Sequence, residues 1–153
     1  MNVLDLSTAA SRRFPARRVT QNIVGGLSPI QSDKFAMGHV VLEPYGGQVP
    51  WHSQEQEELY LVLEGVGEMC LGSERRLLTA GQAVYIPPCV YHQLTNVGET
   101  PLRMIYVYAP GGDVAHWRQE LDGTLPRAGV DAPPLPEGAQ PQWSSTASHG
   151  GSS

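Results

Sequence analysis

The stretch GGQVPWHSQEQEELYLVLEG at residues 46–65, together with GQAVYIPPCVYHQLTN at residues 81–96, decides the fold of this chain. Both stretches are rich in residues that favour β-strands, and glycine and proline interrupt them at short intervals. This pattern is typical of short strands joined by tight turns. Each stretch also carries a histidine beside a strand-like run, so the two stretches are a candidate site as well as a scaffold.

Four side chains in these stretches are candidate metal ligands. His52, Gln54 and Glu58 are separated by two and four residues. Side chains at even separations on an extended strand point to the same face, so we expect these three to share one interior. We expect His92 to join them from a strand that begins after the proline-rich turn at residues 87–89. Two imidazoles, a carboxylate and an amide oxygen then form a candidate metal site.

The alternative is that His52, Glu58 and His92 are structural residues of a metal-free barrel. These groups would then need other partners, because burying an unpaired charge is costly. A single metal ion satisfies all three, so we favour the metal site. The neighbouring carboxylates Glu55 and Glu57 lie out of phase with the ligands, and strand alternation sends them to the rim or surface.

At these residues the chain resembles the cupin family, which is defined by two spaced motifs. The first is Gly, five residues, His-x-His, three or four residues, Glu, six residues and Gly, and its matches here are Gly46, His52, Glu58 and Gly65. The second is Gly, five residues, Pro-x-Gly, two residues, His, three residues and Asn, and its matches are Gly81, Pro87, His92 and Asn96. The resemblance spans about residues 35–108. It implies an all-β, double-stranded β-helix (jelly-roll) barrel with one metal inside.

The chain departs from the cupin motifs at two positions. Gln54 replaces the second histidine of the first motif, and its neutral amide oxygen is a poorer ligand than imidazole. If Gln54 stays off the metal, two histidines and one carboxylate remain, which is the arrangement of non-haem Fe(II) oxygenases. Fe(II) is therefore the favoured cofactor, with Mn, Ni, Co or Zn as alternatives. Cys89 replaces a glycine that often has positive φ, so we expect that turn to be built differently.

Composition limits the class of protein. The 153 residues are enough for one domain with a core, and a net charge of −5 with pI about 5.4 argues against nucleic-acid or anionic-membrane partners. No run is apolar enough to span a membrane, and the first residues lack the apolar core of a signal peptide. The two cysteines, Cys70 and Cys89, are no disulfide framework and fit a reducing compartment. We therefore expect a cytoplasmic protein.

Three segments are expected along the chain. Residues 1–18, with four arginines, are predicted to be a flexible arm, residues 19–122 the barrel, and residues 123–153 a Pro/Gly/Ser-rich extension. A short helix over 114–121, capped by Asp113, is expected to follow the barrel. The expected strands are 19–24, 35–43, 59–65, 66–71, 75–79, 83–86, 92–97 and 101–108. The tail from residue 144 is expected to be dispensable.

The strand that carries Glu58 is also expected to present an apolar outer face. If Glu58 faces inward, Leu59, Leu61 and Leu63 face outward, and three leucines are too many for a solvated strand. We therefore expect them to be covered by other segments or by a second subunit, and we favour a homodimer. His39, on an earlier strand, is interpreted as a histidine with protein partners rather than a further imidazole near the metal.

These observations predict a metal-binding protein that acts on a small molecule. The leading hypothesis is a metalloenzyme that binds and activates an oxygen-bearing organic substrate, dioxygenase-like if the metal is iron. The alternatives are a Lewis-acid isomerase, lyase or cyclase with another metal, and a non-catalytic cupin that binds or senses a small ligand. Fold alone does not choose among them, and no residue is singled out as catalytic.

Overall fold

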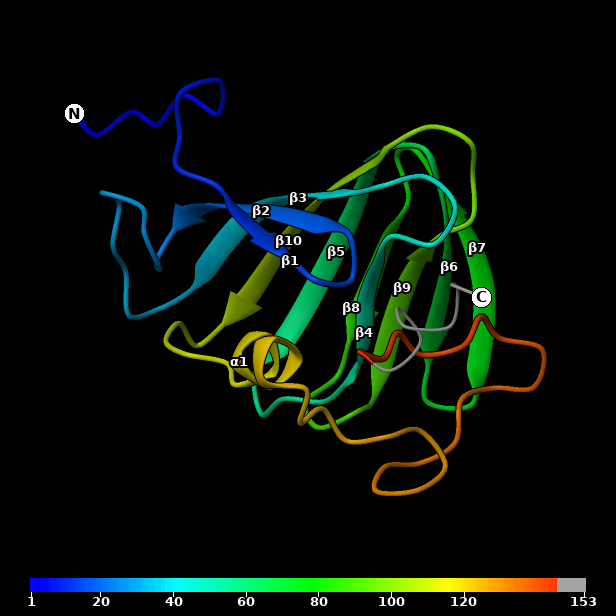
Figure 1. The fold of residues 1–153 in the computed structure, drawn as a ribbon. Coiled ribbons are helices and arrows are strands. Elements are labelled where there is room, and N and C mark those ends of the chain that lie inside the picture. Colours follow the sequence, from blue (N-terminus) through cyan, green and yellow to red (C-terminus); the bar gives the residue numbers. More distant parts are fainter. Residues whose placement is uncertain (146–153) are drawn as a thin grey trace.

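In the computed structural model, which describes residues 1–145, ten strands form two antiparallel sheets that face each other (Figure 1). The larger sheet has the order β1-β2-β3-β10-β5-β8 and the smaller has the order β4-β9-β6-β7. The strands of the larger sheet are β1 Arg12–Phe14, β2 Arg18–Val24, β3 Ala36–Leu42, β10 Leu102–Ala109, β5 Glu57–Glu64 and β8 Ala83–Ile86. The strands of the smaller sheet are β4 Gln48–His52, β9 His92–Asn96, β6 Val66–Leu71 and β7 Glu74–Thr79.

Alternating side chains from both sheets build the core. In β5 the residues facing inward, Tyr60 and Val62, are buried, whereas Leu59 and Leu63 are exposed. The buried apolar cluster draws on both sheets and comprises Val40, Leu42, Val49, Tyr60, Val62, Met69, Leu78, Ile86, Leu94, Leu102 and Met104. Two sheets packed through inward-facing side chains are a jelly-roll arrangement, so the predicted all-β barrel is confirmed.

The N-terminal segment differs from the flexible arm predicted for residues 1–18. Residues 12–14 form β1, which pairs with β2, and Phe14, Ala16 and Arg18 are buried. The four arginines favoured a solvent-exposed arm in the sequence analysis. One of them is buried instead, because a buried carboxylate pairs with it: Arg18 Nη2 lies 2.6 Å from Glu120 Oε1. The ordered barrel therefore begins before residue 19, at Arg12.

Helix α1, His116–Asp122, is held by this buried ion pair. Glu120 accepts a hydrogen bond from the backbone N–H of Ala16 at 3.0 Å, and Arg18 donates to the backbone carbonyl of Gln48 at 2.9 Å. The pair thus joins α1 to the N-terminal segment and to β4. The predicted cap is wrong: the N-cap residue is Ala115, without a side-chain hydrogen bond, and Asp113 instead pairs with Arg118.

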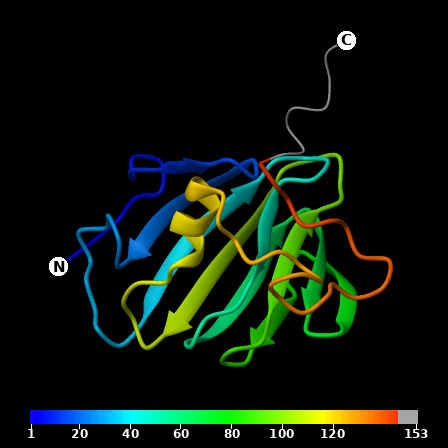
Figure 2. The same cartoon turned by 60° about the horizontal axis from the view of Figure 1, so that its bottom comes forward.

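The C-terminal extension covers the outer face of the smaller sheet. Figures 1 and 2 show it, in orange and red, running from α1 past β4 and β9. The backbone carbonyls of Pro133, Gln140 and Pro141 accept hydrogen bonds from the side chains of Trp51, Gln93 and Gln48. The extension therefore lies on the barrel. Residues 146–153, which include most of the tail expected to be dispensable, lie outside the described residues.

Within residues 1–145, no helix has the length and apolar character needed to cross a bilayer.

The buried ion pair generates a prediction about stability. We expect Glu120→Ala to lower the free energy of unfolding by about 3–5 kcal/mol, because it leaves the guanidinium of Arg18 buried and unpaired. Urea denaturation followed by circular dichroism measures the change. The matched control is Glu43→Ala, which removes the partner of the exposed Arg13 and is expected to cost less than about 1 kcal/mol. Equal losses in the two variants would contradict the role given to the buried pair.

The outer face of β5 generates a prediction about assembly. Leu59 and Leu63 are 37% and 40% exposed, and we propose that a second copy of the chain covers them. Light scattering at high micromolar concentration is then expected to give twice the chain mass of 16.6 kDa. The double variant Leu59→Glu/Leu63→Glu is expected to be monomeric, while Leu77→Glu, on β7 of the other sheet, stays dimeric. A monomeric parent protein would rule the proposal out.

Candidate metal centre

His52 and His92 are brought together by an irregular pairing of β4 with β9. Gln48 and Val49 pair in register with β9, the register then shifts, and His52 lies directly opposite His92. The shift falls at Pro50, which has no N–H to donate to the ladder, and a side chain of β9 satisfies the next N–H. The two imidazole rings are consequently 4.2 Å apart between centroids.

Glu58 reaches the two histidines from the opposite sheet. It lies near the start of β5, which pairs with β8 and β10, whereas His52 ends β4. Residues 53–56 between the two strands are not extended strand. The three side chains therefore converge across the barrel interior. The even spacing had predicted that His52 and Glu58 share one strand face, and this prediction is wrong. The spacing argument thus selected residues that do come together in the structure, but it predicted the wrong arrangement of the strands that carry them.

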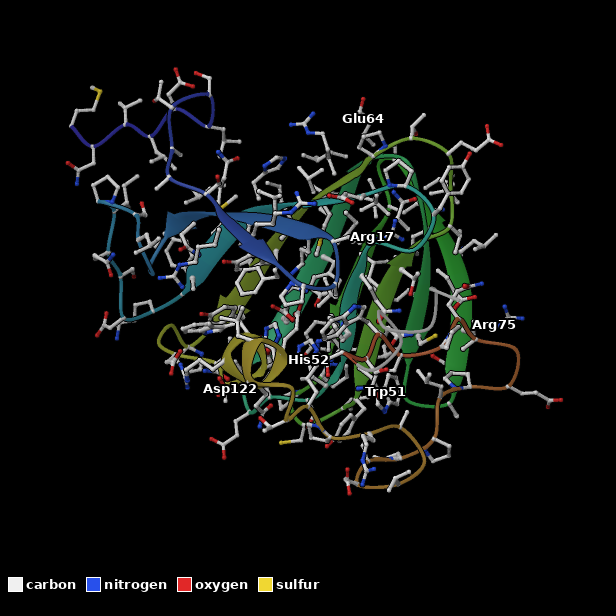
Figure 3. All side chains as sticks on the ribbon, viewed as in Figure 1. Arg17, Trp51, His52, Glu64, Arg75 and Asp122 are labelled. Carbon is white, nitrogen blue, oxygen red and sulfur yellow. The ribbon has the colours of Figure 1, made fainter. Side chains whose placement is uncertain are left out.

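One ligand atom from each of the three residues meets the others closely. Ligand atoms of His52, Glu58 and His92 all lie within 4.8 Å of one another, and Glu58 Oε1 is 3.3 Å from His92 Nε2. All three residues are buried. Figure 3 shows His52 in the barrel interior beside α1. The separations suit three ligands of one ion, so this cluster can hold a metal.

The rings of both histidines are oriented by their backbones. His52 Nδ1 lies 2.7 Å from the carbonyl oxygen of Pro50, and His92 Nδ1 lies 2.9 Å from that of Val90. A carbonyl only accepts, so each Nδ1 carries the proton and each Nε2 is left with a free lone pair. A second hydrogen bond of this kind is how proteins set the tautomer of metal-binding histidines.

The free atoms fit a metal ion because they have no other partner. In the described part of the chain, His52 Nε2, His92 Nε2 and Glu58 Oε1 are buried without a hydrogen bond. Glu58 Oε1 and His92 Nε2 are close, but their geometry is not that of a hydrogen bond. Unsatisfied buried polar atoms are rare in native proteins, and three that face one another require an explanation. A divalent cation satisfies all three.

Burial keeps His52 in the form that binds metal. Desolvation lowers the pKa of His52 well below its ordinary value, and the nearby imidazoles of His116 and His92 lower it further. The ring is therefore neutral near pH 7, where an imidazole with a free Nε2 is a ligand.

Gln54 lies in the loop between β4 and β5, next to the turn of the second motif. Its backbone carbonyl accepts a hydrogen bond from the N–H of Cys89 at 2.7 Å, while both amide atoms of its side chain are buried without a partner. Cys89 has φ of 64°, so the turn keeps the left-handed backbone typical of glycine, and the expectation of a different turn was wrong. That conformation costs a residue with a β-carbon about 1–2 kcal/mol.

A cavity of about 840 Å³ opens beside the centre. Glu58 and Tyr60 line it from β5, Tyr106 and Tyr108 from β10, and Trp117 from α1. The rings of Tyr106 and Tyr108 are 5.8 Å apart and nearly parallel. Gly38, opposite Tyr106 on β3, makes room for its ring, because a β-carbon there would lie 2.4 Å from it. Three tyrosines and a tryptophan thus contribute aromatic surface to the wall of the cavity.

His116 is a residue of the centre that the sequence did not reveal. It is the first residue of α1, it lines the cavity, and its ring stacks on that of His52 at 3.9 Å and 19°. It lies outside both motifs, so no spacing pointed to it. His39, by contrast, lies away from the centre: its Nδ1 is 3.0 Å from Gln21 Oε1, and its Nε2 accepts a hydrogen bond from Arg103. That agrees with the interpretation of His39 as a histidine with protein partners.

The fold and this cluster define the class of the protein. Residues 38–108 match the family model of the cupin domain, and the chain therefore carries a cupin domain, as the two motifs predicted. An RmlC-like cupin from Shewanella frigidimarina has a TM-score of 0.63 at 16% identity, over 74% of this chain and 94% of that one. A protein of Thermus thermophilus has a TM-score of 0.59 at 27% identity, over 72% and 98%.

Curated relatives match part of the chain. An uncharacterized protein of Methanocaldococcus jannaschii is 36% identical over 63 residues, which are 40% of this chain and 50% of that protein. Mannose-1-phosphate guanylyltransferase 2 of Escherichia coli is 29% identical over 77 residues, 50% of this chain and 16% of that enzyme. The chain thus spans half the length of the first relative and a smaller share of the second.

The converging ligand atoms generate a prediction about metal content. We expect His52→Ala, Glu58→Ala and His92→Ala each to weaken metal binding by more than the about 10–100-fold that loss of an outer-shell partner costs. Elemental analysis of protein purified without chelators and chelator competition measure this. His39→Ala is the control and is expected to keep full metal content. Full metal content in the triple alanine variant would place the site elsewhere.

Gln54 generates a prediction about ligand number. We expect Gln54→Ala to keep appreciable metal, because three ligands remain, and Gln54→His to tighten binding, because it adds a strong nitrogen donor. Chelator competition on both variants beside the parent protein compares the affinities. If Gln54→Ala loses metal as completely as His52→Ala, then Gln54 is a full ligand and the centre has four protein ligands.

Proposed function

We propose that this protein is a metal-dependent enzyme that binds and activates a small, oxygen-bearing organic substrate. The observation that carries the proposal is the set of three unpartnered ligand atoms, one of which, on Glu58, belongs to a residue that lines the cavity. Two histidines and one carboxylate leave open positions on a bound ion for substrate. The residues that hold the ion are His52, Glu58 and His92, with Gln54 as a weak or water-mediated fourth ligand.

Fe(II) is the cofactor this ligand set favours, with Mn, Ni, Co and Zn as alternatives. A bound divalent ion supplies Lewis acidity toward a substrate oxygen and, if it is iron, one-electron chemistry with O₂. The protein's own part is to position the substrate and exclude water from it. The cavity of about 840 Å³ falls in the range of about 300–1,000 Å³ usual for small-molecule sites.

The side chains around the cavity support a substrate with an apolar, flat portion. Tyr60, Tyr106 and Tyr108 offer ring faces, and Asn22 donates a hydrogen bond to the hydroxyl of Tyr106 at 3.0 Å. Burial and the nearby carboxylate of Glu58 raise the pKa of Tyr60 well above its usual value. Burial also raises the pKa of Tyr108 to about 12. Both phenols stay protonated near pH 7, and the hydroxyl of Tyr108 donates its proton to the backbone carbonyl of Gly112 at 2.7 Å.

The reaction type is the open part of the proposal. Structural neighbours include proteins described as a polyketide cyclase from Streptomyces resistomycificus, a sugar phosphate isomerase from Silicibacter pomeroyi and an oxalate oxidase. Their identities of 20–21% support a shared fold and a range of chemistries, not one reaction. A Lewis-acid isomerase, lyase or cyclase is therefore the alternative to the oxygenase. We also propose a cytoplasmic location, which the two free cysteines support.

Metal identity and oxygen uptake together test the proposed function. We expect about one Fe per chain in protein purified without chelators, and oxygen uptake on addition of flat hydroxylated or keto acids to the anaerobically loaded protein. Glu58→Ala is the matched control and is expected to show neither. Bound zinc without oxygen uptake would contradict the oxygenase hypothesis and favour the Lewis-acid isomerase, lyase or cyclase. Substoichiometric metal without turnover would favour a ligand-binding cupin.

A further inference from the structure

We propose that His116 hydrogen-bonds the molecule bound at the metal centre and sets its orientation. This inference rests on the proposed metal site and adds a residue from outside the cupin motifs to it. The bound molecule would then have two neighbouring polar atoms. One would coordinate the metal and the other would hydrogen-bond the imidazole of His116. α-Hydroxy acids, vicinal diols and catechols have this chemistry.

The position of His116 carries the first part of the argument. His52 and His92 are buried and do not line the cavity, whereas Glu58 and His116 do. The ring of His116 lies flat against the ring of His52, with centroids 3.9 Å apart. A molecule that reaches the carboxylate of Glu58 from the cavity therefore meets the imidazole of His116 beside it.

The ring nitrogens of His116 are available to such a molecule. Among residues 1–145, neither nitrogen has a hydrogen-bond partner, and the partly buried side chain lines the cavity. The Nδ1 atoms of the two ligand histidines are instead fixed by backbone carbonyls. A neutral imidazole offers one donor and one acceptor, so His116 can bond a hydroxyl or a carboxylate.

The same geometry argues that His116 is not a ligand of the metal. The atoms that meet within 4.8 Å come from His52, Glu58 and His92, and His116 is not part of this group. Its ring instead stacks on that of His52, with 19° between the two planes. Its nitrogens are therefore free to hydrogen-bond the bound molecule, and the experiment separates this role from packing alone.

The buried ion pair explains how His116 is held in place. Glu120 lies one helical turn after His116, so the two side chains lie on the same face of α1. Glu120 is fixed by Arg18 and by the N–H of Ala16, both in the N-terminal segment. Arg12 of β1 also lies over the ring of Trp117, 5.1 Å from its centroid. The N-terminal segment thus holds the helix that carries His116.

Two substitutions separate the hydrogen bond of His116 from its stacking. His116→Phe keeps an aromatic ring against His52 and removes both nitrogens, while His116→Gln keeps a donor and an acceptor. The probe is 4-nitrocatechol, a flat molecule with two adjacent oxygens whose visible absorption changes when it binds a metal. Each variant is loaded with Co(II), and the dissociation constants of Co(II), by chelator competition, and of 4-nitrocatechol, by absorption, are measured.

We expect His116→Phe to bind 4-nitrocatechol about three- to tenfold more weakly than the parent, the effect of one lost hydrogen bond. His116→Gln is expected to bind it within about threefold of the parent, and both variants are expected to bind Co(II) within about twofold. His39→Phe, whose side chain lies outside the centre, is the control and is expected to change neither constant.

Two results would overturn the inference. Unchanged affinity of His116→Phe for 4-nitrocatechol would leave His116 a packing residue only. A loss of Co(II) affinity in His116→Phe as large as that in His52→Ala would make it a ligand. A parent protein that binds Co(II) but not 4-nitrocatechol would also overturn it, because catechols belong to the ligand class that the inference names. A parent that binds no Co(II) would instead refute the proposed function itself, so the two failures are distinguishable.

Discussion

Three polar atoms buried without hydrogen bonds are the constraint around which this barrel is arranged. Each buried donor or acceptor without a partner costs about 1–3 kcal/mol, and here His52 Nε2, His92 Nε2 and Glu58 Oε1 face one another in the interior. The backbone carbonyls of Pro50 and Val90 occupy the other nitrogen of each ring, so rotation of a ring would lose an existing bond. A shared cation is the one partner that satisfies all three at once.

Strand pairing within the cupin domain and segments outside it both support this arrangement. The register shift at Pro50 sets His52 opposite His92, and the C-terminal extension covers the outer side of the same strands through bonds to Gln48 and Gln93. The ion pair between Arg18 and Glu120 holds α1 against the N-terminal segment, beside the centre. Residues 38–108 thus provide the three candidate ligands, and residues before and after them line part of the cavity.

Motif spacing in the sequence selected three residues that meet in the structure, whereas residues held by distant partners could not be predicted from it. Two motifs in register selected His52, Glu58 and His92, although His52 and Glu58 come from two sheets and not from one strand. His116 has no motif and reaches the centre through a helix whose position depends on an ion pair with the N-terminal segment. The arginine-rich composition of that segment predicted a solvent-exposed arm. Composition alone does not reveal that a carboxylate from a distant part of the chain is buried beside one of these arginines.

Anomalous X-ray diffraction from crystals of the cobalt-loaded protein, recorded on both sides of the cobalt absorption edge, tests the central claim most directly. The account predicts one dominant anomalous peak between His52 Nε2, His92 Nε2 and Glu58 Oε1, at about 2.0–2.2 Å from each, the usual range for nitrogen and oxygen ligands of zinc. A cobalt peak at another position, with these three atoms bonded to water or to protein groups instead, would contradict it.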